Sequence, residues 1–454
     1  MENTKTTKSG LLTGTPWKTI LFFAMPMIIG NLLQQLYNMV DAVVASHYVG
    51  EGALAAIGAS YALTNVFIAL ALGLNIGSAV VISQLYGQAD YASTKIGINT
   101  LIINAAAMGI VLGGFGLIAS EWMLGALNTP AGIINDANIY LSIYFWGLPF
   151  LFVYNAVSAI MNALGDSKTP LLLLLFSSVF NMVLDIILVK DMGIAGVAVA
   201  TLVAQGISAI AAYFILQVKI KCLSAARAPY SVSMTKTMLK IAIPTTIQQC
   251  IIFLGMLLVQ TVVNGFGETI LAGYTAGSRF ESVFIIPLVA LGNAYSTYTA
   301  QNIGAGNNER VKQGYKASSF IALAISIFIL LILQIFGKLL LTAFMGSGYT
   351  QLAFDTGLQY IHFLSFFFII MGMKSITDAV LRGAGDVMVS TIANFVNLGI
   401  RILLAMILSK TLGICAVWLA LPIGWLANLI ISFIRYRSGV WESIKITGSK
   451  SLDA

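Results

Sequence analysis

The stretch PMIIGNLLQQLYNMVDAVVASHYVG, residues 26–50, is an apolar segment of membrane-spanning length that carries polar side chains on one face. Gln34, Tyr37, Asn38 and Asp41 recur at i, i+3, i+4 and i+7, so a helix places them together. A charge at the bilayer centre costs about 2.5–3.5 kcal/mol on insertion scales, so Asp41 is expected to face a protein interior or a water-filled cavity. Asp41 is then either a functional residue or a structural carboxylate hydrogen-bonded by its polar neighbours.

The composition is that of a chain that resides in lipid. Of 454 residues, 58% are hydrophobic and 9% are charged, whereas soluble domains carry about 25% charged residues. The net charge of +7 lies in short loops, so it predicts no nucleic-acid partner. The two histidines are isolated and the three cysteines are scattered, so we predict neither a metal site nor a disulfide framework. The N-terminal residues lack the pattern of a cleaved signal peptide.

We predict an all-α integral membrane protein with twelve transmembrane helices, because twelve apolar segments are long enough to cross a bilayer. Pro26 falls inside the first segment and is expected to act as a hinge there. The segments are approximately 16–48, 53–84, 97–120, 138–162, 170–189, 194–218, 238–265, 270–301, 315–336, 353–380, 388–409 and 414–434.

The loops show a strong bias in positive charge. Eighteen Lys and Arg residues lie on the side that both termini share, against Lys190, Lys338 and Lys410 on the other side. By the positive-inside rule, both termini are expected in the cytoplasm of a multi-pass protein of the cytoplasmic (inner) membrane.

The two halves of the chain repeat each other. SQLYGQAD (83–90) returns as AQNIGAGN (300–307), MNALGDSKTP (161–170) as LRGAGDVMVS (381–390), and 181–196 as 401–416, at offsets of 217 to 220. Several matches in order indicate a duplication. Six spans per half predict two lobes related by a pseudo-two-fold axis along the membrane normal. We expect an N-lobe at 1–225 and a C-lobe at 226–454.

The predicted N-lobe holds acidic side chains at membrane depth. Asn181 and Asp185 are one helical turn apart and face the same way, whereas the C-lobe residues at the matching positions are Arg401 and Ala405. Together with Asp41, Asp185 would form a coupled pair that holds a proton or a sodium ion. Thr201 adds a neutral oxygen of the kind that a hard cation prefers. The alternative to this coupling-ion site is a structural network.

The predicted C-lobe has charges of both signs within its helices. Lys374 and Asp378 are spaced for an ion pair along one helix. Arg279 and Glu281 are expected to find partners on neighbouring helices. These residues and Arg401 form either an internally neutralised network that fixes packing, which we favour, or a site that binds substrate or ion.

Gly383-Ala-Gly385-Asp386 matches the GxGD motif of intramembrane aspartyl proteases. The motif falls at a cytoplasmic helix end, and its repeat partner Leu164-Gly165-Asp166 sits in the equivalent loop, so we interpret both as turn residues. The chain is not expected to be an enzyme.

These motifs resemble the multidrug and toxic compound extrusion (MATE) transporters. The resemblance rests on LRGAGD (381–386), NALGDSKTP (162–170), the pair at 83–90 and 300–307, and VDAVVASHYVGEGALAAIGAS (40–60). It covers nearly the whole chain and is most similar to the DinF-type branch. It implies export of drug-like, often cationic amphipathic compounds in exchange for protons or sodium ions.

In the DinF-type branch the resemblance places the cation site in the first lobe, at Asp41, Asn181, Asp185 and Thr201, with Gln34 and Tyr37 in the same polar network. The NorM-type branch carries a glutamate on the seventh helix, where this chain has Gln248 and Gln249. No cofactor is implied beyond the coupling ion, and the expected partners are small amphipathic molecules and the bilayer, with no obligate protein partner.

Two other classes of function remain as alternatives. A flippase for a lipid-linked oligosaccharide would be expected to carry additional helices and a more cationic cavity. An ion channel would need a selectivity filter, which the sequence does not contain.

Overall fold

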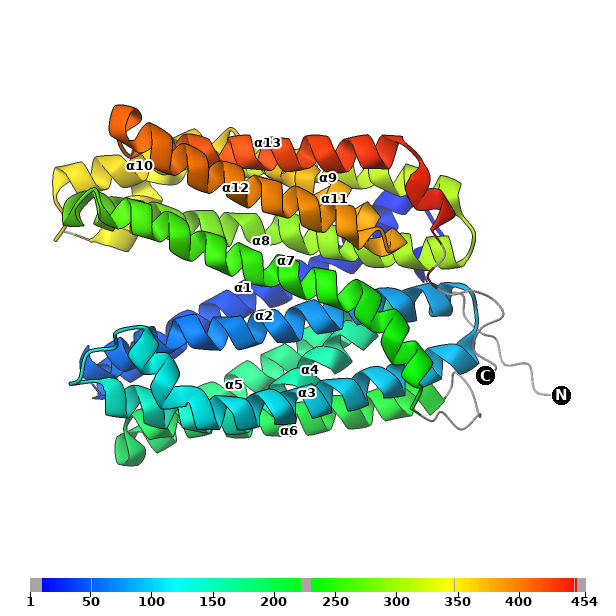
Figure 1. Ribbon diagram of the computed structural model, residues 1–454, viewed down its shortest axis with the longest axis horizontal. Coiled ribbons are helices and arrows are strands. Elements are labelled where there is room, and N and C mark those ends of the chain that lie inside the picture. Colours follow the sequence, from blue (N-terminus) through cyan, green and yellow to red (C-terminus); the bar gives the residue numbers. More distant parts are fainter. Residues whose placement is uncertain (1–9, 50, 222–229, 347, 445, 447–454) are drawn as a thin grey trace. The chain divides into compact units, whose positions relative to one another are not determined.

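The chain folds into helices throughout its described parts, as seen in a computed structural model (Figure 1). The structure describes residues 10–49, 51–221, 230–346, 348–444 and 446; the side chains of residues 38–47, 49, 51, 53, 54, 62, 253 and 257 are not described. Two short 3-10 helices, η1 (Gly10–Leu12) and η2 (Val440–Ser443), flank the α-helices. These are α1 (Pro16–Val49), α2 (Glu51–Gly87), α3 (Tyr91–Ala126), α4 (Ile134–Ala163), α5 (Lys168–Met192), α6 (Ile194–Lys221), α7 (Val232–Asn264), α8 (Glu268–Gly304), α9 (Asn308–Met345), α10 (Gln351–Ser365), α11 (Phe368–Ala384), α12 (Val387–Leu412) and α13 (Cys415–Arg437).

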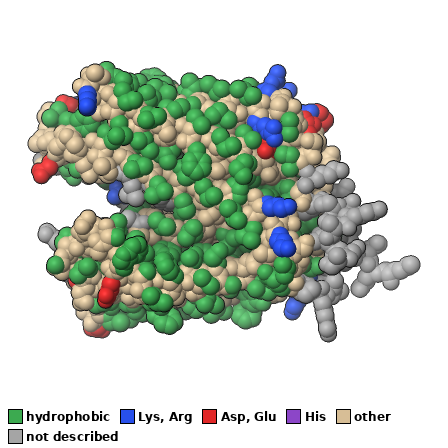
Figure 2. Space-filling model, viewed as in Figure 1, with side chains coloured by type: hydrophobic (Ala, Val, Ile, Leu, Met, Phe, Trp, Pro, Cys, Tyr) green, Lys and Arg blue, Asp and Glu red, His purple; other side chains and the backbone are tan. Residues whose placement is uncertain are grey.

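The prediction of an all-α membrane protein with twelve spans is confirmed. Among the described residues, eleven helices are long and apolar enough to cross a bilayer, and α10 with α11, bent by 52° at their break, makes a twelfth if the pair is one span. Hydrophobic side chains cover much of the surface seen in Figure 2. Phe22, Ile118 and Phe320 are 73%, 89% and 71% exposed. Such surfaces are stable against lipid tails and not against water.

The break between α10 and α11 was not predicted from the sequence, where 353–380 reads as one span. Neither proline nor glycine causes it. Instead, the Gln334 amide of α9 donates to the His362 carbonyl at 3.0 Å and to the Ser365 hydroxyl at 2.9 Å, and that hydroxyl donates to the same carbonyl at 2.7 Å. The side chains of Gln334 in α9 and Ser365 in α10 therefore donate hydrogen bonds to a backbone carbonyl next to the break, where the regular helical hydrogen bonding is interrupted.

The duplication is visible in the backbone at equivalent positions. Gly165 and Gly385 both end a helix-to-loop turn with positive φ, 86° and 87°, and Gly193 and Gly413 do so at 57° and 58°. Both pairs are 220 residues apart, the offset of the sequence repeat in this region. An L side chain rarely adopts this conformation, so glycine recurs where the turn requires it.

The helices gather into two compact units, each described by itself. The α2–α6 unit comprises Ile29–Gln249, and the α8–α13 unit comprises the described residues up to Ile28 and those from Cys250 onward. These contact-defined units differ from the expected lobes in one respect, because α1 and α7 each contribute to both. The first half of α1 packs into the core of the α8–α13 unit through Ile20, Phe23 and Ala24. The lobe boundaries at residues 225 and 226 stay a prediction.

In the α8–α13 unit, Arg310 at the start of α9 holds the residues before α1. Its guanidinium donates to the carbonyls of Gly14 and Thr13 at 2.9 and 2.7 Å, and its charge lies 5.5 Å from the centre of the Tyr298 ring. Asn302 donates to the Leu11 carbonyl at 3.3 Å. These contacts fix the start of α1 to the α8–α9 connection.

In the α2–α6 unit, α4 packs against α2, α3 and α6, and α5 packs against α6. Close approach is set by small residues. A Cβ on Gly109 of α3 would lie 2.6 Å from the Pro149 Cα of α4, and one on Gly196 of α6 would lie 2.5 Å from the Leu188 carbonyl oxygen of α5. This packing brings the polar faces of α5 and α6 together. The second half of α1 continues unbroken past Pro26, so the hinge at that proline stays a prediction.

Candidate functional site

Asn181, Asp185 and Thr201 meet where α5 packs on α6. Asn181 and Asp185 are 1% and 0% exposed, and they lie one turn apart on α5. The Asn181 amide donates to the Thr201 hydroxyl at 3.3 Å, and that hydroxyl donates to the Val197 carbonyl at 3.0 Å. Three of the four residues predicted to bind a cation are therefore neighbours in the structure.

The first helix supplies the other predicted residues. Gly30 of α1 lies against α5, where its Cβ would be 3.7 Å from Leu171 and Leu174, so the second half of α1 runs beside α5. Gln34 is exposed and Tyr37 is half-buried. The side chains of Asn38 and Asp41 lie outside the described residues, so their placement beside Asp185 stays a prediction.

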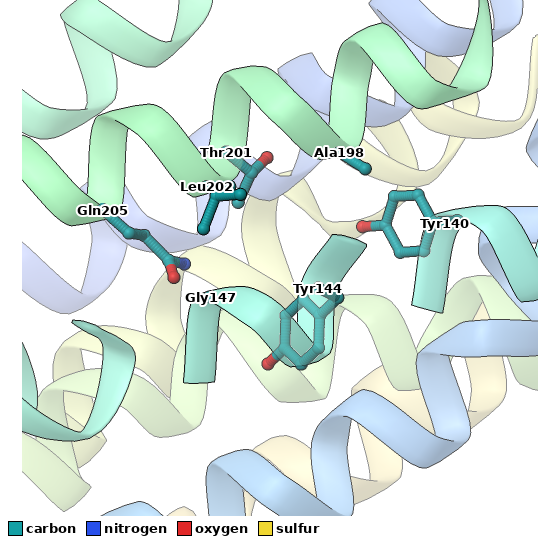
Figure 3. A pocket seen from close by; sticks show the side chains of 7 residues that line it. All are labelled: Tyr140, Tyr144, Gly147, Ala198, Thr201, Leu202 and Gln205. Carbon is teal, nitrogen blue, oxygen red and sulfur yellow. The ribbon is translucent and has the colours of Figure 1, made fainter. Parts of the chain in front are cut away.

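A small pocket of about 10 Å³, room for about one water molecule, opens between α4 and α6 (Figure 3). Tyr140, Tyr144 and Gly147 of α4 line one side, and Ala198, Thr201, Leu202 and Gln205 of α6 line the other. The Tyr144 hydroxyl is buried and has no hydrogen-bond partner among the described residues. Thr201 lines this pocket and also contacts Asn181, which lies one turn from the buried Asp185 on α5.

Sequence reasoning missed Tyr140 and Gln205 as site candidates, and it considered Tyr144 only as part of an aromatic run, 144–152, that could line a cavity. The signal was weak, since Tyr140 and Tyr144 at i and i+4 read equally well as packing residues of a membrane helix. Only the packing of α4 on α6 brings Tyr140 and Tyr144 to Thr201, which lies more than fifty residues later in the chain, whereas Gln205 follows Thr201 by one turn of α6.

Lys374 and Asp378 of α11 form the expected ion pair, with Nζ 3.2 Å from Oδ2. Lys374 also donates to the Asn394 amide oxygen at 3.0 Å, and the Ser432 hydroxyl donates to the Asp378 carboxylate at 2.6 Å. Both charged side chains are largely buried. A buried pair with these additional hydrogen bonds has the character of a packing network.

The remaining charges in the α8–α13 unit are arranged differently. The Tyr360 hydroxyl of α10 donates to the Glu281 carboxylate of α8, so Glu281 has a partner on a neighbouring helix as expected. Arg279 is exposed, and Arg401 of α12 is half-buried. Arg382 donates to Asn293 at 3.0 Å and to Ser296 at 3.3 Å.

The GxGD motif is part of a helix connection. Gly385 ends α11 in the left-handed conformation, with φ 87°, and Asp386 precedes α12. The Arg435 guanidinium donates to the Asp386 carboxylate at 2.6 Å from Nε. A single buried carboxylate held by arginine at a helix end is unlike a catalytic pair of aspartates.

The repeat partner Asp166 has the same arrangement with a cation from the last helix of its unit, since Lys219 of α6 donates to it. Thr169 also donates to Asp166, at 2.6 Å. Burial raises the pKa of the Asp166 carboxyl, but the hydrogen bonds from Lys219 and Thr169 outweigh burial and hold that pKa below its ordinary value.

Comparisons with known proteins identify the family. A sequence model of the MatE family matches residues 26–187 and 244–407, one match in each repeat. The chain is 31% identical over 441 residues to a probable multidrug resistance protein, YpnP, of Bacillus subtilis, covering 96% of this chain and 98% of that one. It is 25% identical to an FAD transporter of Shewanella oneidensis, covering 98% and 99%.

Solved structures show the same fold. A MOP superfamily transporter from Pyrococcus furiosus superposes with a TM-score of 0.89 at 25% identity, covering 96% of this chain and 99% of that one. An outward-facing multidrug resistance MATE transporter of the MOP superfamily gives the same TM-score, identity and coverage. The chain therefore belongs to the MatE family, the multidrug and toxic compound extrusion transporters, and is a multi-pass membrane transporter and not an enzyme.

Proposed function

We propose that this transporter exports drug-like, often cationic amphipathic compounds in exchange for protons or sodium ions. The coupling ion binds in the N-lobe at Asp41, Asn181, Asp185 and Thr201. The observation that carries the proposal is the contact of Asn181 with Thr201 at 3.3 Å, beside the fully buried Asp185. Gln34, Tyr37 and Asn38 support this site from α1.

The chemistry of these groups suits either ion. A buried carboxylate is costly unless it is protonated or compensated by a cation. Carboxylate, amide and hydroxyl oxygens are the ligands that a hard cation prefers, and Asp185, Asn181 and Thr201 provide one of each. Binding of a proton or a sodium ion at this place would stabilise the conformation in which the acids are buried.

Exchange follows if ion and substrate favour different conformations. A ligand shifts a conformational equilibrium only by its difference in affinity for the two states. Thr201 contacts Asn181, one turn from Asp185, and also lines the small pocket between α4 and α6. A small polar group that enters this pocket and an ion bound beside Asn181 would act on the same hydroxyl, which supports coupling between them.

The relatives support export over the alternative functions. YpnP is named as a probable multidrug resistance protein, and MepA of Staphylococcus aureus as a multidrug export protein. No specific observation favours the flippase, and transporter relatives disfavour a channel. The excess of Lys and Arg in loops on one side supports an inner-membrane location with both termini in the cytoplasm. The DinF-type branch stays a prediction from motif resemblance.

The test is ethidium-driven cation exchange in inside-out membrane vesicles, with wild type and Asp41→Asn compared under an imposed proton gradient and an imposed sodium gradient. We expect ethidium to dissipate one gradient with wild type only, and the responsive gradient names the ion. A folded Asp41→Asn protein that exchanges ethidium at the wild-type rate would contradict the proposal. A lipid-linked precursor that accumulates on deletion, without dye exchange by wild type, would favour the flippase.

A further inference from the structure

The small pocket between α4 and α6 contains a buried hydroxyl whose partner the fold does not supply. The Tyr144 hydroxyl lines this pocket, is shielded from solvent, and has no hydrogen-bond partner in the part of the chain that the structure describes. A buried hydroxyl without a partner is costly, so such groups in folded proteins generally bond to protein or to ordered water. The partner of Tyr144 is therefore expected inside the pocket.

The size of the pocket restricts what this partner can be. Its volume of about 10 Å³ holds about one water molecule and no drug-like compound. Inside a membrane protein, polar groups have no access to bulk water and must be satisfied internally. An internal water needs at least two polar partners, so the pocket qualifies as a water site only if its walls offer them.

The walls offer two polar groups that have no partner among the described residues, one on each helix (Figure 3). The first is the Tyr144 hydroxyl of α4. The second is the Gln205 amide of α6, which makes no hydrogen bond to another described residue. A water both accepts and donates, so it can accept from the Tyr144 O–H and donate to Gln205 Oε1. Tyr140 and Thr201 add two further hydroxyls to the lining.

The space for a water exists because residue 147 has no side chain. A Cβ on Gly147 of α4 would lie 3.2 Å from Leu202 Cδ1 and 3.9 Å from Gln205 Oε1, and both of these side chains line the pocket. An alanine methyl group would therefore project into the space that a water needs. A Cβ on Gly206 of α6 would instead make an ordinary contact of 3.8 Å with the Phe150 ring, which is not part of the lining.

A second tyrosine shows how a buried hydroxyl is satisfied without water. Tyr295 of α8 is fully buried, and its hydroxyl donates to the Val311 carbonyl of α9 at 2.9 Å. Tyr144 and Tyr295 therefore have the same chemistry and a shielded hydroxyl, but only Tyr144 borders a space of the size of a water. This difference separates a water site from burial alone.

We propose that this pocket is a binding site for one ordered water molecule, held between the Tyr144 hydroxyl and the Gln205 amide. The water links α4 to α6 one helical turn from Thr201. Tyr144 thereby acts as a positioning residue for the coupling ion, because it fixes the part of α6 that carries the Thr201 hydroxyl. The link to ion binding rests on the proposed function, whereas the water site itself does not.

The first test is hydroxyl-radical footprinting of the purified protein in detergent. X-rays split water into radicals that react where they form, and mass spectrometry gives the oxidation rate of each tyrosine. A side chain that is shielded from bulk solvent is oxidised only if a water is bound beside it. Tyr144 and Tyr295 are compared in wild type, Gly147→Ala and Gly206→Ala.

We expect Tyr144 to be oxidised and Tyr295 to be protected in wild type. Gly147→Ala is expected to reduce oxidation of Tyr144 to the level of Tyr295, because the methyl group takes the space of the water. Gly206→Ala should keep the wild-type value. Protection of Tyr144 in wild type would overturn the water site, even if Gly147→Ala failed to fold. Unchanged oxidation of Tyr144 in folded Gly147→Ala would also overturn it, because the water would then lie elsewhere.

The second test separates positioning from packing. Tyr144→Phe removes only the hydroxyl, and Tyr213→Phe makes the same change at an exposed position of α6. Ethidium efflux from proteoliposomes is measured against the concentration of the active ion. We expect Tyr144→Phe to weaken the apparent ion affinity about five-fold at an unchanged maximal rate, since one neutral hydrogen bond is lost. Tyr213→Phe should behave as wild type.

A lower maximal rate with wild-type ion affinity in Tyr144→Phe would assign this hydroxyl to packing and overturn its positioning role. Wild type that exchanges ethidium for neither ion would overturn the export proposal. The footprinting result would still decide the water site in that case, because it does not depend on transport.

Discussion

The Asn181 amide of α5 donates to the Thr201 hydroxyl of α6 at 3.3 Å, one helical turn from the fully buried Asp185. This contact joins the face of α5 that carries Asp185 to a hydroxyl that also lines the small pocket between α4 and α6. An ion and a substrate would influence each other at the Asn181–Thr201 contact.

Asp185→Asn is expected to abolish ion-coupled export while the protein still folds, because an amide is similar in shape but cannot gain a proton or neutralise a cation. Gradient-driven ethidium efflux should fall by at least about ten-fold. Asp191→Asn, on the exposed end of the same helix, is the control and should leave efflux unchanged. Full coupled efflux by Asp185→Asn would remove this residue from the site.

Thr201→Val removes the hydroxyl that Asn181 bonds, at nearly constant volume. A lost neutral hydrogen bond is worth about 1 kcal/mol, so the apparent ion affinity should weaken about five-fold. The measurement is the dependence of efflux on the concentration of the active ion. Thr201→Ser keeps the hydroxyl and should restore affinity; failure of this variant to do so would show that the methyl group matters more.

Gly273→Ala in α8 should destabilise the protein, because its Cβ would lie 2.2 Å from the Ala353 carbonyl oxygen of α10. Overpacking of this kind costs about 1–3 kcal/mol. Gly399→Ala on α12 meets nothing within 4 Å and is the matched control. Thermal unfolding in detergent measures the difference, and equal melting temperatures for both variants would contradict the close approach of α8 and α10.

Arg310→Gln should loosen the residues before α1, since the guanidinium holds the carbonyls of Gly14 and Thr13. Hydrogen bonds from charged groups contribute about 1.5–3 kcal/mol, and the exposure of these contacts places the effect at the lower end. Limited proteolysis before residue 16 should become faster. An unchanged cleavage rate would show that Asn302 and the apolar contacts of Leu11 suffice.

Asp166→Asn should cost stability at neutral pH and little in acid. Burial raises the pKa of the Asp166 carboxyl, but hydrogen bonds from Lys219 and Thr169 outweigh burial, so the folded pKa lies below the ordinary value of 3.8. The ionised carboxylate therefore stabilises the folded protein above pH 3.8, and this stabilisation is lost as the pH falls through the folded pKa. The pair is partly exposed, so the effect is about 0.2–1 kcal/mol. Melting temperatures at pH 7 and pH 3 test this, and an equal difference at both would contradict it.

Much of the fold could be predicted from the sequence because lipid imposes simple rules. The lengths of the apolar segments and the repeat at 217 to 220 residues predicted twelve membrane spans. The i, i+4 spacing of Lys374 and Asp378 predicted their ion pair. The break after Ser365 could not be predicted, because the side chain that bonds to it, Gln334, lies about thirty residues earlier on another helix.

The candidate sites show the same limit. Asn181 and Asp185 share a helix, so their common face could be predicted from spacing, and the hydroxyl oxygen of Thr201 made it a predicted cation ligand, which it remains. The pocket depends on the packing of α4 on α6, and the Tyr360 contact to Glu281 joins residues 79 apart. Long-range contacts of this kind leave no local pattern in the sequence.

The most direct test of the central claim is the movement of the coupling ion itself. In proteoliposomes containing purified protein, flux of the active ion is recorded while an ethidium gradient is imposed, for wild type, Asp41→Asn and Asp185→Asn. We predict ion movement opposite to the dye with wild type and none with either folded variant. Ion movement at the wild-type ratio in both variants would contradict ion binding in the N-lobe.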